Sequence, residues 1–217
     1  MKTKGIITKF FLALFTITFS ASFGQETAPQ PVATIQPTSW AFSKGTNVIN
    51  AGVGIGGYYS YWGGGYYETP NFILSYENGT FGNVGPGTIS LGALFSYKGI
   101  SDNYIGSDGY NYTDTWAYWI LGFRSAYHLN VPDAPRFDPY AGLMLGYYFL
   151  NHTFSTNNPD YMHPGNPGYV YYSASYPNYA ALGLFVGARY YLSNAVGVWG
   201  ELGYGYTTLA IGVNFKI

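Results

Sequence analysis

The sequence predicts an all-β protein that folds as an eight-stranded antiparallel up-and-down transmembrane β-barrel, and two observations lead to this prediction. In residues 209–217 every odd position is apolar, whereas the even positions hold small or polar residues. Because a strand directs alternate side chains to opposite faces, such a strand has one apolar and one polar face. The same alternation recurs in seven earlier segments, and the charges within all these segments lie on the polar phase. These charged residues are Glu77, Lys98, Arg124, Arg189, Glu201 and Lys216.

The first 24 residues have the features of a secretory signal peptide. Three lysines precede an apolar run over residues 10–19, and Ser22 and Gly24 place small side chains where a signal peptidase requires them. The run is too short to be a membrane-spanning helix. We therefore expect export and cleavage before Gln25; a buried N-terminal strand or helix is the alternative. The sequence contains no cysteine, so neither a disulfide nor a lipid-modified N-terminus is expected.

The composition favours insertion into a membrane. Charged residues make up 9% of the chain, whereas soluble domains contain roughly a quarter. Aromatic residues reach 21%, with 25 tyrosines, and there are 30 glycines; interfacial tyrosine girdles and a crowded inner wall use such residues. Within the hydrocarbon of a membrane, only helices and closed barrels pair all of their backbone hydrogen-bonding groups. No segment after the predicted signal is apolar over the length of a spanning helix. Without the signal, six basic and ten acidic residues remain, which argues against a nucleic-acid partner.

Strands are expected within residues 46–217. Residues 25–45 contain three prolines and no periodicity, so we interpret them as a periplasmic lead-in. The eight predicted strands cover residues 47–59, 71–78, 88–98, 115–129, 139–152, 178–192, 196–206 and 209–217.

The predicted connections alternate in length along the chain. Turns on the inner side of the membrane are expected at residues 79–87, 130–138 and 193–195, and the outer loops at residues 60–70, 99–114 and 153–177. An even number of strands places both termini in the periplasm and the longer loops outside. The last outer connection, near Thr207, is very short. Residues 169–172 could form an extra hairpin above the membrane, so ten strands remain an alternative to eight.

Four segments carry a resemblance to a known family: residues 138–147 (DPYAGLMLGY), 187–191 (GARYY), 201–204 (ELGY) and 212–217 (GVNFKI). Together with the signal and the strand pattern, they make the chain resemble the small OmpA/OmpX-like outer-membrane β-barrels, a porin-family or outer-membrane protein β-barrel domain. The resemblance implies residence among the lipids of the outer membrane of a Gram-negative-type bacterium, reached through the barrel-assembly machinery. That machinery commonly recognises a phenylalanine at the last position of the barrel, whereas here Phe215 lies two positions before Ile217. No peptidoglycan-binding domain follows the barrel, so we do not expect a wall-anchoring role.

The inward-facing charges are expected to form a network. An eight-stranded barrel is about filled by its own side chains, and an unpaired charge in a water-poor interior is costly. We predict that Arg189 pairs with Glu201 across adjacent strands, and that Arg124 reaches Glu77 or Glu201. The functional alternative is a gated ion path or a substrate pocket.

The sequence offers little sign of catalytic or metal chemistry. The glycine-rich residues 52–57 lie inside a strand pattern, whereas a nucleotide-binding loop opens a helix. His128, His152 and His163 fall on different strands and loops, so we expect neither a metal site nor a cofactor. Ser125 and His128 should point to opposite faces of one strand, so they cannot form a nucleophile–base pair, and we expect no enzyme.

The outer loops are the place where a binding function could reside. They carry five acidic residues and no Lys or Arg, and tyrosine with glycine and asparagine gives an adaptable contact surface for an extracellular protein or a glycan. Alternatively, the tyrosines extend the interfacial girdle. The candidate contact residues are Trp62, Tyr66, Tyr67, Tyr110, Tyr112, Tyr161, Tyr169 and Tyr171.

We therefore expect a role in envelope integrity or surface contact. A narrow channel for small solutes is the main alternative. A lipid-modifying enzyme and a soluble barrel of the lipocalin kind are the others.

Overall fold

The computed structural model describes residues 41–57, 66–161, 170–175 and 178–217. The predicted signal peptide and most of the predicted lead-in lie outside these residues and stay predictions. The outer-loop contact candidates Trp62 and Tyr169 also lie outside the described residues and stay predictions.

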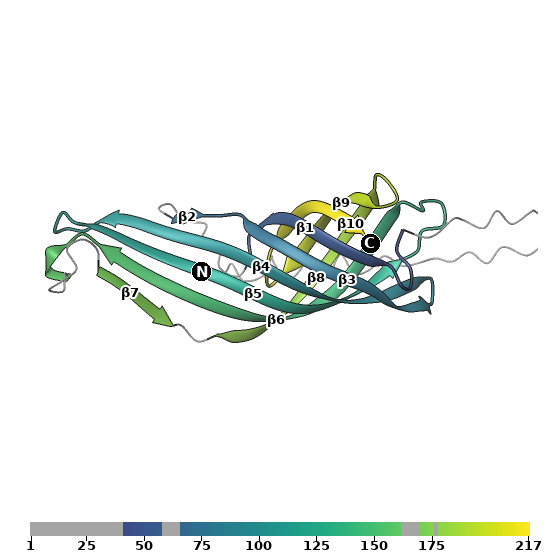
Figure 1. Ribbon diagram of the computed structural model, residues 1–217, viewed down its shortest axis with the longest axis horizontal. Coiled ribbons are helices and arrows are strands. Elements are labelled where there is room, and N and C mark those ends of the chain that lie inside the picture. The colour runs from purple at the N-terminus through teal and green to yellow at the C-terminus, as the bar shows by residue number, and fades with distance from the viewer. Residues whose placement is uncertain (1–40, 58–65, 162–169, 176–177) are drawn as a thin grey trace, which may run out of the picture. The chain divides into compact units, whose positions relative to one another are not determined.

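Eight antiparallel strands form a closed barrel (Figure 1), which confirms the predicted fold class. In barrel order they are β1 (Asn47–Ile55), β3 (Asn71–Val84), β4 (Gly87–Ile105), β5 (Asn111–Leu129), β6 (Phe137–Thr156), β8 (Tyr179–Tyr191), β9 (Val196–Tyr204) and β10 (Leu209–Lys216). Each pairs with the next, and β1 closes the barrel by pairing with β10 in a register that places Ala51 opposite Val213. Among the described residues, no helix is long and apolar enough to cross a membrane.

Three strands continue well past the others and form an extension of the sheet. β4, β5 and β6 contain 19, 19 and 20 residues, whereas β1 and β9 contain 9 each. Two short strands widen this extension: β2 (Tyr66–Glu68) pairs with β4, and β7 (Val170–Ser175) pairs with β6. The 3₁₀ helix η1 (Pro159–Tyr161) follows β6.

The extension corrects a sequence prediction. Residues 99–114, predicted as a loop, continue the β4–β5 ladder until Ile105 pairs with Asn111. The apolar alternation stops there although the ladder continues, because backbone pairing does not require an apolar face. The two short strands join the extension and leave the barrel wall with eight strands.

The inner turn predicted at residues 79–87 exists but is much shorter than expected. β3 continues to Val84 and β4 begins at Gly87, while the register shifts twice between Gly79 and Val84. Such bulges interrupt the two-residue period, which is why the pattern ended early in the sequence. Gly85 makes the tight connection with a φ of 58°, in the left-handed region that glycine adopts readily.

The apolar phase of the strands faces outward and the polar phase faces inward. Leu184 and Phe123 are each 55% exposed and Val213 is 43% exposed, whereas Arg189 is 0% and Glu201 is 2% exposed. This is the orientation predicted from the alternation.

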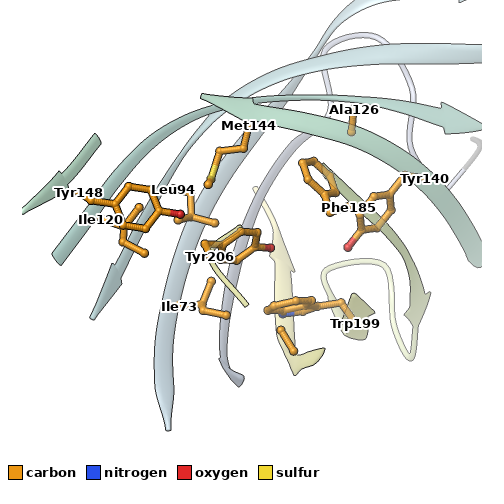
Figure 2. Packing of buried hydrophobic residues seen from close by; sticks show 11 residues of the cluster. Ile73, Leu94, Ile120, Ala126, Tyr140, Met144, Tyr148, Phe185, Trp199 and Tyr206 are labelled. Carbon is orange, nitrogen blue, oxygen red and sulfur yellow. The ribbon is translucent and has the colours of Figure 1, made fainter. Parts of the chain in front are cut away.

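Large side chains fill the interior and face glycines on the wall. Figure 2 shows Met144 of β6, Phe185 of β8 and Tyr206 of the β9–β10 turn lying near one another inside the barrel. A Cβ added to Gly142 on the inner wall would lie 2.3 Å from the carbonyl oxygen of Ser125 and 2.5 Å from the Phe185 ring. Inner-wall glycines therefore make room for aromatic side chains that cross the lumen.

Candidate functional site

The centre of the barrel contains a network of buried charges around Arg189. Its Nη2 lies 2.7 Å from Oε1 of Glu77, and its Nη1 lies 3.0 Å from Oδ2 of Asp138. Its Nε donates a hydrogen bond of 3.1 Å to Oδ1 of Asn50. Arg189 is on β8 and Glu77 is on β3, four strands away around an eight-stranded barrel. The ion pair therefore bridges opposite walls and crosses the lumen.

Arg124 of β5 extends the network to a second acid. Its Nη2 lies 2.8 Å from Oε2 of Glu201, and its Nε lies 3.2 Å from Oε1 of Glu77. Glu201 also accepts hydrogen bonds from the hydroxyls of Tyr140, at 3.2 Å, and Tyr206. Glu77 thus contacts both arginines and connects the two halves of the network.

Of the two ion pairs predicted for the lumen arginines, one is confirmed and the other is wrong. Arg124 contacts both of the acids proposed for it. The predicted Arg189–Glu201 pair is wrong, because the β8–β9 register places Trp199 opposite Arg189 and Gly187 opposite Glu201. The long arginine side chain instead crosses the lumen.

A buried histidine, which the sequence analysis left out of the network, adjoins these charges. Nδ1 of His128 lies 2.8 Å from Oδ1 of Asp138, and its Nε2 lies 3.2 Å from Oε2 of Glu77. The ring of Phe42 stacks on the imidazole with centroids 3.7 Å apart, and it also lies under the Arg189 guanidinium. Phe42 belongs to the end of the predicted lead-in and is buried. In the sequence, residues 40–42 (WAF) form a short apolar run among polar residues. This run could have identified Phe42 as a buried residue.

The same cluster brings together a serine, a histidine and an aspartate from three different strands. Oγ of Ser90 lies 3.1 Å from Nε2 of His128, whose Nδ1 faces Asp138. Hydrolases use this order of groups to activate the serine. Here Ser90 and His128 are fully buried beneath Phe42, and Oγ of Ser90 also lies 3.2 Å from Glu77. A substrate has no access to Ser90 in this arrangement, so the three residues act as members of the interior network. Ser125, considered from the sequence, donates to the backbone oxygen of Ser90 at 2.9 Å.

The two predicted lysines lie at the ends of the barrel interior. Lys98 of β4 forms an ion pair of 2.8 Å with Glu68 of β2, where the extension begins. Lys216, near the C-terminus, lies over the ring of Tyr191 at 4.3 Å from its centroid.

The outer-loop candidates are distributed over the extension. Tyr66 and Tyr67 lie exposed on β2, and Tyr161 lies exposed in η1. Tyr110 follows the β4–β5 turn, and Tyr112 lies on β5. The remaining described candidate, Tyr171, pairs with Ser155 in the β6–β7 ladder.

The turn at the tip of the extension is held by side-chain hydrogen bonds. The hydroxyl of Tyr112 donates to Oδ2 of Asp108 at 2.5 Å, and Nδ2 of Asn158 donates to both of these groups at 3.0 Å. The Tyr112 hydrogen bond lowers the pKa of the Asp108 carboxyl below its usual value. The acid at the tip therefore stays charged under all physiological conditions.

The histidines considered as metal ligands lie apart. His128 is in the interior network, His152 pairs with Asp114 at 2.5 Å in the extension, and His163 lies outside the described residues. Within the described ranges no group of three or more His, Cys, Asp or Glu side chains could hold a metal ion.

Several solved structures are similar to this chain, among them the following two. The N-terminal β-barrel domain of Pseudomonas aeruginosa OprF has a TM-score of 0.44 and 11% sequence identity, covering 81% of this chain and 100% of that one. Ail, the attachment invasion locus protein of Yersinia pestis, has a TM-score of 0.41 and 13% identity, covering 80% and 99%. The likeness to both structures is one of fold alone. No protein-family model and no curated protein matches the chain.

Proposed function

We propose that this protein is an integral outer-membrane β-barrel with a closed lumen, and that its role is non-enzymatic. The apolar exterior supports membrane insertion, because an outward-facing band of residues such as Leu184 and Phe123 requires an apolar surrounding. A soluble barrel of the lipocalin kind would have the reverse orientation, with apolar side chains inside. Export through the predicted signal peptide is part of this proposal.

The observation that carries the closed lumen is the ion pair between Glu77 and Arg189. It joins strands on opposite sides of the barrel, and Arg124 and Glu201 fill the space beside it. Toward the extension, a cavity of about 20 Å³ remains among residues that include Asn71, Lys98 and Tyr148. Such a volume holds about one water molecule. A narrow channel for small solutes would have to break several buried ion pairs to open.

Single-channel recording tests the closed lumen against the channel alternative. The purified full-length protein, inserted into a planar bilayer, should give no reproducible conductance steps at neutral pH. A large-pore porin inserted in the same way provides the positive control. Regular ohmic steps from the folded barrel would contradict a closed lumen.

Membrane insertion has its own test. The protein should require detergent for extraction from the cell envelope and should fractionate with the outer membrane. Release by high salt or alkali without detergent would contradict insertion.

The activity of such a closed barrel is expected at its surface. β4, β5 and β6 continue beyond the barrel wall, and the extension holds exposed aromatic and acidic residues such as Tyr104 and Asp108. We propose envelope integrity or surface contact through this extension as the role. Deletion of the gene should leave the mass profile of lipid A unchanged, because a lipid-modifying enzyme would alter it.

A further inference from the structure

We infer that one face of the extension docks a positively charged peptide segment of a partner protein. This inference rests on the proposed surface role and specifies the chemistry of the partner. The docking face consists of strand residues that share one side of the sheet, together with the adjacent Tyr161: Tyr66, Asp102, Tyr104, Tyr112, Asp114, Trp116, His152, Phe154 and Tyr161.

The strand register shows that these residues share a side. Asp102 pairs with Asp114 and Tyr104 with Tyr112 across β4 and β5, and residues two apart on a strand point the same way. Tyr66 pairs with Asp102 from β2. On the other flank, β6 places Phe154 opposite Asp114 and His152 opposite Trp116.

Aromatic rings lie on both sides of the two aspartates along the strands. Toward the tip, Tyr104 stacks on Tyr112 with centroids 5.3 Å apart, and Tyr112 contacts Phe154 at 6.0 Å. Toward the barrel, Trp116 stacks on His152 at 5.1 Å.

Several of these rings are accessible. Tyr66, Tyr104 and Tyr161 are each more than one-third exposed. These exposed rings offer faces on which a cation can rest.

The negative charges of Asp102 and Asp114 are only partly compensated by neighbouring side chains. Like charges directly opposite each other in a sheet destabilise it. Nε2 of His152 lies 2.5 Å from Oδ1 of Asp114, but the side chain of Asp102 has no hydrogen bond or ion pair with the described part of the chain. An added cation between the strands would relieve this repulsion.

The charge of the whole extension points to the same class of ligand. Residues 99–116 and 150–161 contain four aspartates and no Lys or Arg. Carboxylates between exposed aromatic rings are complementary to Lys and Arg side chains, through ion pairing and cation–π contact. The extended backbone of the face suits a linear basic segment more than a small isolated cation.

A binding measurement with defined peptides tests the inference. The full-length protein in nanodiscs of zwitterionic lipid would be titrated with fluorescent octa-arginine and with octa-glutamate as the opposite-charge control. We expect octa-arginine to bind, and octa-glutamate to show no binding. The variant with both Asp102→Asn and Asp114→Asn should bind octa-arginine about tenfold more weakly, and Tyr104→Ala about fivefold more weakly.

A matched control separates this face from general acidity. Asp133→Asn removes one exposed acid at the opposite end of the barrel and should leave octa-arginine binding unchanged. Equal loss with Asp133→Asn, unchanged binding by the double variant, or no binding of octa-arginine would each overturn the inference. Binding of neutral oligosaccharides in place of the peptide would also overturn it and would identify the face as a glycan site. These failures, observed on a folded and non-conducting barrel, would leave the proposed membrane role intact.

Discussion

Glu77 and Arg189 are 112 residues apart in the sequence, yet Oε1 of the glutamate lies 2.7 Å from Nη2 of the arginine. Both side chains are fully buried. Because their strands lie on opposite sides of the barrel, this contact spans the lumen and occupies its centre. Arg124 contacts the same glutamate oxygen, so Glu77 compensates two buried cations at once.

The first prediction concerns that double contact. Glu77→Gln should lower the free energy of unfolding by about 3–5 kcal/mol, because it leaves buried arginines without their shared counter-charge. Urea-induced unfolding in lipid vesicles measures this change. Glu201→Gln should also destabilise the barrel, since it removes the partner of Arg124.

The control for this prediction is Asp133→Asn, which removes an exposed acid between β5 and β6. Because this side chain is exposed, the loss should stay within about 0.5 kcal/mol. If all three variants unfold at the same urea concentration as the parent, the network does not stabilise the barrel.

The second prediction compares two glycine substitutions on opposite faces of the wall. Gly142→Ala should destabilise the barrel by about 1–3 kcal/mol, because its Cβ would collide with the Phe185 ring and the Ser125 carbonyl. Gly200→Ala places its Cβ on the outer face, where the nearest atom is 3.9 Å away, and should be nearly neutral. Equal effects of the two substitutions on unfolding would contradict the assignment of inner and outer faces.

The third prediction concerns the residue that covers the interior histidine. Phe42→Ala should reduce the free energy of unfolding by about 3–5 kcal/mol, since it opens a cavity beside His128 and Arg189. Phe42→Leu keeps most of the volume and should lose only about 0.5–1.5 kcal/mol with the ring stacking. A wild-type unfolding midpoint for Phe42→Ala would show that the contacts of Phe42 with His128 and Arg189 do not stabilise the barrel.

The strand pattern was sufficient to predict the barrel wall. The outward residues Leu184 and Val213 and the inward residues Arg189 and Glu201 all follow from the two-residue period, because the two faces of the wall differ sharply in polarity. The period failed in two places. Register shifts interrupt the period at the bulged end of β3 near Phe81, and the extension beyond Gly99 has no apolar phase.

The interior network was only partly predictable for a related reason. Sequence periodicity identifies which residues point inward, and it identified Glu77 and Arg124 correctly. It does not give the tilt of the strands or the distance across the lumen, which decide that Arg189 reaches Glu77 instead of Glu201. Asp138 was missed because it stands at a strand start beside Pro139, where turn and strand signals overlap.

The fourth prediction concerns the tip of the extension and its dependence on pH. The Tyr112 hydrogen bond lowers the pKa of Asp108 from its usual 3.8. The interaction therefore stabilises the folded tip above that pH and is lost as the pH falls through the lowered value. Tyr112→Phe should return the Asp108 pKa toward 3.8, as measured by carboxyl carbon NMR chemical shifts. An unchanged titration in this variant would contradict the role of the hydroxyl.

The orientation of the barrel wall can be measured directly on the unmodified protein. A carbene reagent that partitions into the acyl chains would be activated by light, and the labelled residues identified by mass spectrometry. Labels on Leu184, Phe123 and Val213, with none on Arg189 or Glu201, are the predicted result. Labels on the arginine and glutamate, with none on the three apolar residues, would contradict both the orientation and the membrane assignment.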